Sequence, residues 1–165
     1  MLYNHVRMHA TLLRIWKWLP FGLQRVISRI LLPSFQVFAV AVIFNSKRQI
    51  LLGKTTYQRL HPWGLLGGNL KLGEEPEHAV IRELSEETGL EIKNKRLLLA
   101  KNSRARDQIG LFYWSMIQGG SFHQSGEISE IGYFDVDNLP DVHPSDVALI
   151  KQLSEMVAGI ENELA

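Results

Sequence analysis

The sequence predicts an α/β domain with a mixed β-sheet, preceded by an N-terminal helical extension. The chain has 165 residues, of which 45% are hydrophobic and 21% are charged, so it carries enough apolar surface for a core of ordinary size. The segment 35–44 is apolar on both alternating faces, which is typical of a strand covered on both sides. Because no repeat, linker or second boundary follows, we expect one layered domain over residues 34–165.

Composition excludes several kinds of site. The chain has no cysteine, which excludes disulfides, thiolate zinc sites, iron–sulfur clusters and cysteine nucleophiles. Charge is unevenly distributed, because residues 1–73 contain 10 Lys and Arg and no acid, whereas residues 74–165 contain 17 acidic and 8 basic residues. This division favours a basic half that faces an anion and an acidic half that holds a cation. Phosphate and a divalent metal fit that description.

Residues 1–33 are predicted to form two short amphipathic helices separated at Pro20. We expect these helices to pack on the domain, and a homodimer contact or binding to a membrane surface are the alternatives. Basic residues recur through the apolar stretch, unlike in a signal peptide. No apolar run reaches the roughly 20 residues of a membrane span. We therefore expect a cytoplasmic protein.

Further strands and a final helix follow the first strand. The turn at 45–48 leads into a returning strand over 49–52, and the other strand candidates are 96–100, 109–117 and 130–136. The last helix is expected to start near Ser145 and to fray after Gly159. These elements predict the mixed sheet.

A helix over 76–88 carries the most informative residues. Pro76 lies in its first turn, and Gly89 stands where a left-handed residue ends many helices. Glu83, Glu86 and Glu87 are spaced i, i+3 and i+4, so their carboxylates share one helix face.

Three carboxylates on one helix face repel each other. Arg82 can reach Glu86 as an i+4 neighbour, but one guanidinium cannot neutralise three carboxylates. The remaining charge favours a hard divalent cation bound by oxygen ligands, and a site with few protein ligands suits Mg²⁺. A solvated acidic helix face is the alternative.

The stretch from Gly68 to Leu90 resembles a complete Nudix box. The family pattern is Gly-x5-Glu-x7-Arg-Glu-hydrophobic-x-Glu-Glu-x-Gly-hydrophobic, and all nine specified positions over 23 residues match. The resemblance implies an α/β/α sandwich and hydrolysis of a pyrophosphate bond with Mg²⁺ or Mn²⁺. It also implies that Glu83, Glu86 and Glu87 are metal ligands, that Gly67 offers its carbonyl oxygen, and that Glu74 orders the site or binds metal.

The same resemblance implies the remaining roles. Arg82 would hold the glutamates, and Glu83 is one candidate for the general base. In some members the base lies on a later loop, for which Glu127 is the first choice and Glu130 the second. Arg59, Arg104 and Arg106 are candidates for binding substrate phosphates. The aromatic residues that could stack on a base, although core positions are the alternative, are Tyr57, Trp63, Phe112 and Trp114.

The resemblance implies a substrate in which a nucleoside diphosphate is linked to another group, such as a nucleotide sugar or a nucleoside triphosphate. No proline lies between Pro76 and Pro140, where ADP-ribose-cleaving members usually carry one. An RNA 5′-end pyrophosphohydrolase is one alternative, because it would use both the basic half and the box. A non-catalytic Nudix ligand-binding module is another, although such modules commonly lose box glutamates.

Overall fold

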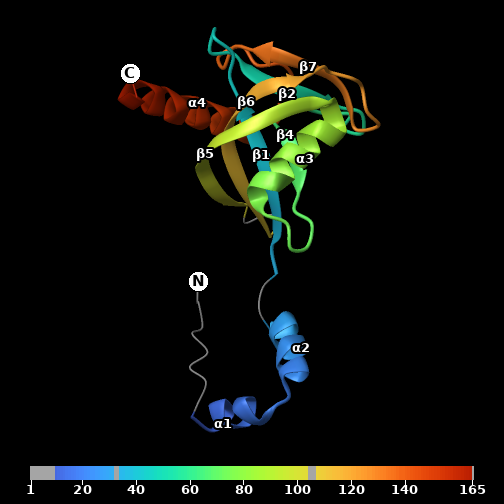
Figure 1. The fold of residues 1–165 in the computed structure, drawn as a ribbon, viewed down its shortest axis with the longest axis vertical. Coiled ribbons are helices and arrows are strands. Elements are labelled where there is room, and N and C mark those ends of the chain that lie inside the picture. The colour runs from blue at the N-terminus through green and yellow to red at the C-terminus, as the bar shows by residue number, and fades with distance from the viewer. Residues whose placement is uncertain (1–9, 32–33, 104–106, 165) are drawn as a thin grey trace. The chain divides into compact units, whose positions relative to one another are not determined.

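The structure is a computed structural model that describes residues 10–31, 34–103 and 107–164 (Figure 1). Its contacts divide the chain into two compact units, Met1–Phe35 and Gln36–Ala165, called here the N-terminal unit and the main domain. The N-terminal unit contains the helices α1 (Ala10–Trp18) and α2 (Phe21–Leu31). The prediction of two short helices is therefore confirmed, whereas their packing on the main domain stays a prediction.

The break between α1 and α2 has a local cause. The backbone amide of Gln24 donates to the carbonyl oxygen of Pro20, so Pro20 precedes the first turn of α2, where a missing N–H leaves nothing unpaired. The side-chain amide of Gln24 donates to the carbonyl oxygens of Trp16 and Leu19, at 2.8 and 3.0 Å. One side chain thereby links the start of α2 to the end of α1.

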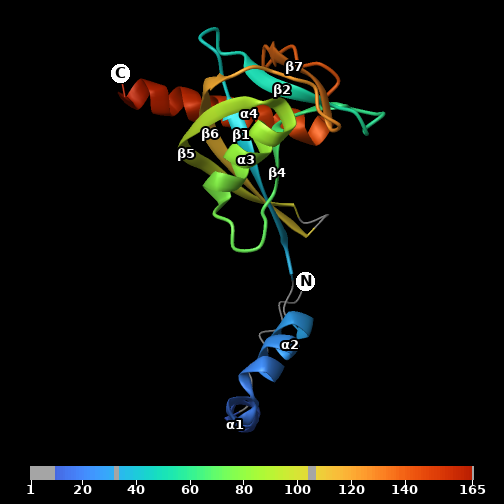
Figure 2. The same cartoon turned by 45° about the vertical axis from the view of Figure 1, so that its right-hand side comes forward.

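The main domain is a series of strands interrupted by one helix and followed by another (Figures 1 and 2). In chain order its elements are β1 (Gln36–Ile43), β2 (Ile50–Thr55), β3 (Trp63–Gly64), β4 (Leu66–Asn69), α3 (Pro76–Thr88), β5 (Leu90–Ser103), β6 (Gln108–Gly120), β7 (Ile128–Phe134) and α4 (Pro144–Leu164).

The strands form two sheets, with the orders β4-β1-β6-β5 and β3-β2-β7. In the first sheet β1 and β6 run parallel, while β4 and β5 pair antiparallel with their neighbours. The predicted mixed sheet is therefore confirmed. The second sheet is antiparallel throughout.

Strand β1 is the centre of the main domain, because each of its faces is covered by a different helix. Ala39 and Ala41 belong to a core cluster with Leu84 of α3, whereas Val40 and Val42 belong to a second cluster with Leu153 of α4. This arrangement explains why the segment is apolar on both faces. It gives the layered α/β architecture that the sequence predicts.

Helix α3 has the predicted bounds. Pro76 occupies its first turn, and Gly89 caps its end in the left-handed conformation with φ of 72°, donating its N–H to the carbonyl oxygen of Ser85 at 3.0 Å. A side chain at Gly89 would also overlap the ring of His123, so both backbone conformation and space require glycine there.

Several element bounds differ from the predicted ones: β2 continues to Thr55, β6 continues to Gly120, and β7 spans Ile128–Phe134 rather than 130–136. Strand β5 begins at Leu90 rather than Arg96, and three register irregularities against β6 interrupt the alternation that would have shown its full length. Helix α4 continues past Gly159 to Leu164 instead of fraying. Glu161 forms a 3.5 Å ion pair with Arg48 in this last part of the helix.

None of the helices in the described ranges is both long enough and apolar enough to cross a membrane. This agrees with the absence of a long apolar run in the sequence.

We expect the packing of α3 to dominate the stability of the region that carries the box. Leu84 is fully buried between α3 and the sheet, so Leu84→Ala should lower the free energy of unfolding by about 3 kcal/mol. Leu72→Ala is the matched control, because Leu72 is fully exposed and should change that free energy by less than about 0.5 kcal/mol. Urea denaturation measures both, and equal losses would contradict this view of the core.

Candidate active site

Two glycines of β4 bring the sheet against α3. Gly67 pairs with Val40 of β1, and a side chain at Gly67 would overlap the backbone of Ala39 and Val40. At Gly68 an added Cβ would lie 2.6 Å from both carboxylate oxygens of Glu83. Close approach to backbone atoms therefore requires glycine at Gly67, whereas Gly68 leaves the space that the carboxylate of Glu83 occupies.

Arg82 is the centre of the ionic network of the box. Its Nε and Nη2 donate to the two carboxylate oxygens of Glu74 at 2.7 and 2.8 Å. Its Nη1 donates to Glu83 at 2.8 Å and to Glu86 at 3.2 Å. The predicted contact with Glu86 is present, but it is the longest of the four. The bidentate pair with Glu74 is the geometrically strongest, and helical spacing gives no sign of it.

The loop before α3 is folded around Glu74. Its carboxylate also accepts a hydrogen bond from the backbone amide of Lys71, at 2.8 Å. The hydrogen bonds from Arg82 and from this amide lower the pKa of Glu74 to about 2. Both oxygens of Glu74 are thus engaged within the protein, which is the geometry of an orienting residue.

Glu87 lies in a different electrostatic environment. Burial, followed by repulsion from Glu83, Glu127 and Glu86, raises the pKa of Glu87 to about 7, and attraction by Arg82 offsets only a minor part. The carboxylates of the box therefore divide into a set paired with Arg82 and one half-buried carboxylate, Glu87, that a positive charge would stabilise.

Glu87 and Glu127 line the same small pocket, of about 50 Å³. Tyr57 and Gly67 also line it, and burial together with the charges of Glu127 and Glu87 raises the pKa of Tyr57. Residues from helix α3, strand β4 and two loops therefore line this pocket together. Of the four aromatic candidates for substrate contact, Tyr57 is the one that lines it.

Hydrogen bonds from a neighbouring loop hold the segment that carries Glu127. The Thr56 hydroxyl donates to the carbonyl oxygen of Gly126 at 2.7 Å, and the Thr56 amide donates to the carbonyl oxygen of Glu127 at 2.9 Å. Ser125 Oγ accepts from the amides of Glu127 and Ile128 at 3.2 and 3.0 Å. The sequence gives no signal for the Thr56 contacts, because they join residues 70 positions apart.

The other candidate residues lie elsewhere. Glu130 forms an exposed 3.5 Å ion pair with Lys54, and Arg59 is exposed in the β2–β3 loop. Arg104 and Arg106 lie outside the described residues. The remaining aromatic candidates have packing roles, because Phe112 and Trp114 are buried and Trp63 packs edge-on against Phe134.

The donor set fits a hard divalent cation chemically, since it consists of carboxylates and the carbonyl oxygen of Gly67. Within the described part of the chain, no three acidic or histidine side chains already form a ready ligand set. The contacts of Arg82 with Glu83 and Glu86 explain this, because they direct carboxylate oxygens toward the guanidinium. The pKa of Glu87 is raised first by burial and then by the charges of Glu83, Glu127 and Glu86, so a cation beside it would be favourable.

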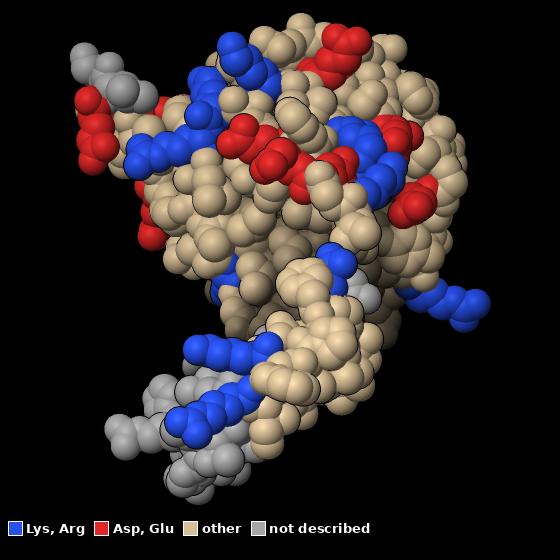
Figure 3. All heavy atoms as spheres, turned by 60° about the horizontal axis from the view of Figure 1, so that its bottom comes forward, with Lys and Arg blue, Asp and Glu red and all other residues tan. Residues whose placement is uncertain are grey.

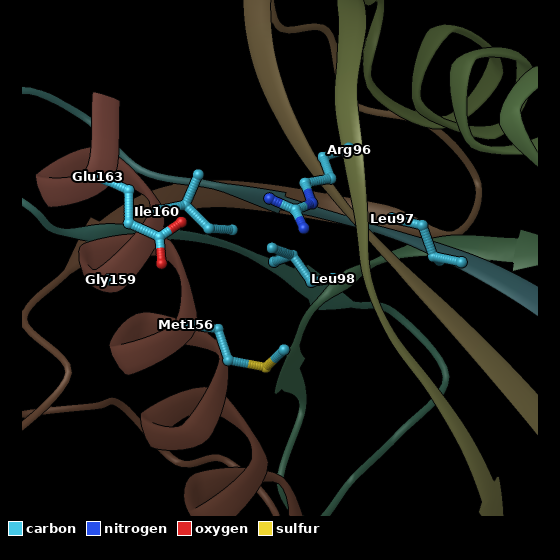
Figure 4. A pocket seen from close by; sticks show the side chains of 7 residues that line it. All are labelled: Arg96, Leu97, Leu98, Met156, Gly159, Ile160 and Glu163. Carbon is cyan, nitrogen blue, oxygen red and sulfur yellow. The ribbon is translucent and has the colours of Figure 1, made fainter. Parts of the chain in front are cut away.

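A larger cavity, of about 260 Å³, lies away from these carboxylates, between β5 and the end of α4 (Figure 4). Arg96 extends toward α4 in this view, whereas Leu97 points away from it. The cavity contains none of the box residues, so its size does not bear on the chemistry of the box.

We expect the pair of Glu74 with Arg82 to make stability depend on pH. The pKa of Glu74 is lowered from 4.5 in the unfolded chain to about 2 in the folded protein. Ionised Glu74 therefore stabilises the fold at pH values above the unfolded pKa, and this contribution is lost as the pH falls through the folded pKa. The stability difference between wild type and Glu74→Gln should therefore be largest above pH 4.5 and shrink toward pH 2. Urea unfolding with EDTA measures it, with Glu77→Gln as control. A difference that does not change with pH would contradict the pairing.

Comparisons with known proteins agree with this geometry. The chain is 35% identical over 123 residues to the ADP-ribose pyrophosphatase of Methanocaldococcus jannaschii, covering 68% of this chain and 71% of that protein. It is 29% identical over 127 residues to the NAD-capped RNA hydrolase NudC of Chromobacterium violaceum, covering 74% of this chain and 48% of that protein. The chain thus spans about half the length of such NudC relatives.

Solved structures show the same fold. A UDP-X diphosphatase has a TM-score of 0.65 at 21% identity, over 79% of this chain and 70% of that one. An ADP-ribose pyrophosphatase from Streptococcus suis has a TM-score of 0.64 at 24% identity, over 74% of this chain and 91% of that one. The NUDIX domain family model matches residues 34–153. Because this match spans well over half of the chain and contains the complete box, the protein belongs to the Nudix hydrolase family.

Proposed function

We propose that this protein is a divalent-metal-dependent hydrolase that cleaves a phosphoanhydride bond in a nucleoside diphosphate linked to another group. The observation that carries the proposal is the pocket in which Glu87, with its raised pKa, and Glu127 lie together beside Gly67. A site with excess negative charge and oxygen ligands suits a cation and a phosphate-bearing substrate. A cytoplasmic location is part of this proposal.

Glu83, Glu86 and Glu87, with the carbonyl oxygen of Gly67, are the groups that would hold Mg²⁺ or Mn²⁺. The metal would stabilise developing negative charge on the phosphates and make a water more acidic. Glu74 is better suited to orienting Arg82, because both of its oxygens already accept hydrogen bonds.

Glu127 is the stronger candidate for the residue that accepts a proton from water. A general base must have an oxygen that can take up a proton at the pocket. Glu83 accepts a 2.8 Å hydrogen bond from Arg82, so one of its oxygens is already engaged within the protein. Glu127 lines the pocket from a loop that Thr56 holds in place.

The substrate class follows from the pocket and from the named relatives together. ADP-ribose and NAD-capped RNA appear in the names of two relatives. ADP-ribose is kept among the candidate substrates, although this chain lacks the proline that ADP-ribose-cleaving members usually carry. A nucleotide sugar or a nucleoside triphosphate is also consistent with the proposal. The NudC relative favours the RNA 5′-end as the second candidate, with the basic residues of the chain contacting phosphates.

A substrate panel tests the proposed class. The full chain is assayed with Mg²⁺ or Mn²⁺ against ADP-ribose, NAD, nucleotide sugars, nucleoside triphosphates, NAD-capped RNA and triphosphorylated RNA. Metal-dependent release of a nucleoside monophosphate or of pyrophosphate supports the proposal. Binding of these compounds without any hydrolysis would instead support a non-catalytic module.

The box acids should be essential for turnover. Glu86→Gln and Glu87→Gln each remove a negative charge from the proposed metal site, and we expect metal-dependent turnover to fall at least about a hundredfold. Glu77→Gln is the matched control, because Glu77 is an exposed acid on the same helix. Steady-state kinetics measure all three variants, and the melting temperature verifies that they fold. Near-normal rates in the first two would contradict the assignment.

Thr56 should act through Glu127. Thr56→Val removes the hydroxyl that donates to Gly126, and we expect the turnover number to fall about fivefold, in line with one hydrogen bond of roughly 1 kcal/mol. In a double-mutant cycle, Thr56→Val should cause little further loss in a Glu127→Gln background. Fully additive losses would show that Thr56 acts on something other than the base.

A further inference from the structure

The two N-terminal helices are amphipathic in three dimensions as well as in sequence. On α2, Gln24, Arg25 and Ser28 share one side at about 100° per residue. The apolar residues on the other side are Leu23, Val26, Ile27 and Ile30. Arg25 lies 5.8 Å from the centroid of the Phe21 ring, which places an aromatic ring beside a positive charge at the polar border.

The apolar side chains of this unit are exposed. Trp18 is 93% exposed and Ile30 is 77% exposed, and large apolar residues between them are also open to solvent. The two core clusters of the main domain are formed by residues from Phe38 onward. The main domain therefore builds its two core clusters from its own residues.

The charges of the unit indicate the chemistry of that partner. Residues 1–35 contain five Lys and Arg and no Asp or Glu, and Arg14, Lys17 and Arg25 are exposed on the helices. In the space-filling view the acidic side chains gather on the main domain (Figure 3). A surface that combines an apolar layer with negative charge matches both properties of these helices.

Other partners match one property only. RNA would satisfy the basic residues, but it offers no apolar layer for a face of Leu, Val and Ile. The exposed large apolar residues of the main domain are spread over different elements, among them Leu60, Leu72, Leu97 and Met116. Self-association of two apolar faces would cover the apolar residues but leave the basic residues without a partner of opposite charge.

We propose that α1 and α2 bind the surface of an anionic lipid membrane, with their apolar faces in the interface and their basic residues at the lipid headgroups. Helices of this kind lie in the plane of the interface, and each basic residue near the surface adds to the attraction. Trp18 ends α1 and Phe21 begins α2, so two aromatic side chains lie at the junction of the helices. Aromatic side chains suit the headgroup layer of a membrane. This surface is independent of the proposed hydrolytic site.

Co-sedimentation of the full chain with vesicles tests the proposal. The chain should bind vesicles of phosphatidylcholine with phosphatidylserine, bind vesicles of phosphatidylcholine alone far more weakly, and dissociate as salt is raised. The triple variant Arg14→Glu, Lys17→Glu and Arg25→Glu should lower partitioning on the order of a hundredfold. The matched control reverses Lys47, Lys93 and Lys101, which are exposed on the main domain, and should retain binding.

A second pair of variants tests the apolar face. Val26→Ser with Ile30→Ser should weaken vesicle binding, whereas Leu60→Ser with Leu72→Ser, which alters two exposed leucines of the main domain, should not. Absence of binding to either vesicle, or equal loss in test and control variants, would overturn the proposal. The proposal would also be overturned if the chain bound no vesicles and the triple variant instead lost RNA binding or dimer formation. Hydrolysis in solution is measured separately and can fail without affecting this result.

Discussion

The guanidinium of Arg82 organises the site, because it holds carboxylates from the loop before α3 and from the helix itself. It binds Glu74 through two hydrogen bonds and contacts Glu83 and Glu86 through a third nitrogen. Acids at helical neighbour spacing would otherwise repel one another. With Arg82 among them, their oxygens have defined directions, and the loop from Lys71 to Glu74 is folded against the helix.

The same interaction leaves negative charge at one place. Arg82 only partly compensates Glu87, which is half-buried near Glu83, Glu127 and Glu86 and has a pKa raised to about 7. A cation beside Glu87 would offset the repulsion between its carboxylate and the neighbouring acids that Arg82 does not offset. The division between neutralised and unneutralised carboxylates is thus the physical basis of the proposed metal site, and it explains why the acidic pocket lies on one side of the box.

The distribution of charge along the chain gives its two units different chemistry. In the proposed site the acids of the main domain would supply metal ligands and a candidate base, while the N-terminal unit carries basic residues and exposed apolar side chains. In the proposals made above, one unit performs hydrolysis and the other holds it at an anionic lipid surface. Their independence follows from the main domain having its own core clusters.

The sequence by itself determined features that depend on neighbouring residues. The bounds of α3 follow from Pro76 and Gly89, and the apolar character of β1 on both faces predicted the layers on either side of it. The family was visible in the box because its spacing lies within one continuous stretch. Local patterns do not show a strand whose register is interrupted, so most of β5 was missed.

Tertiary structure alone decided the contacts between distant segments. The pairing of Arg82 with Glu74 depends on how the loop folds back, and the approach of Glu127 to Glu87 joins a loop to a helix across two strands. Thr56 holds Gly126 from another part of the chain. Sequence periodicity describes which face of an element is apolar, but the distance between two elements is set by how the sheets and helices pack.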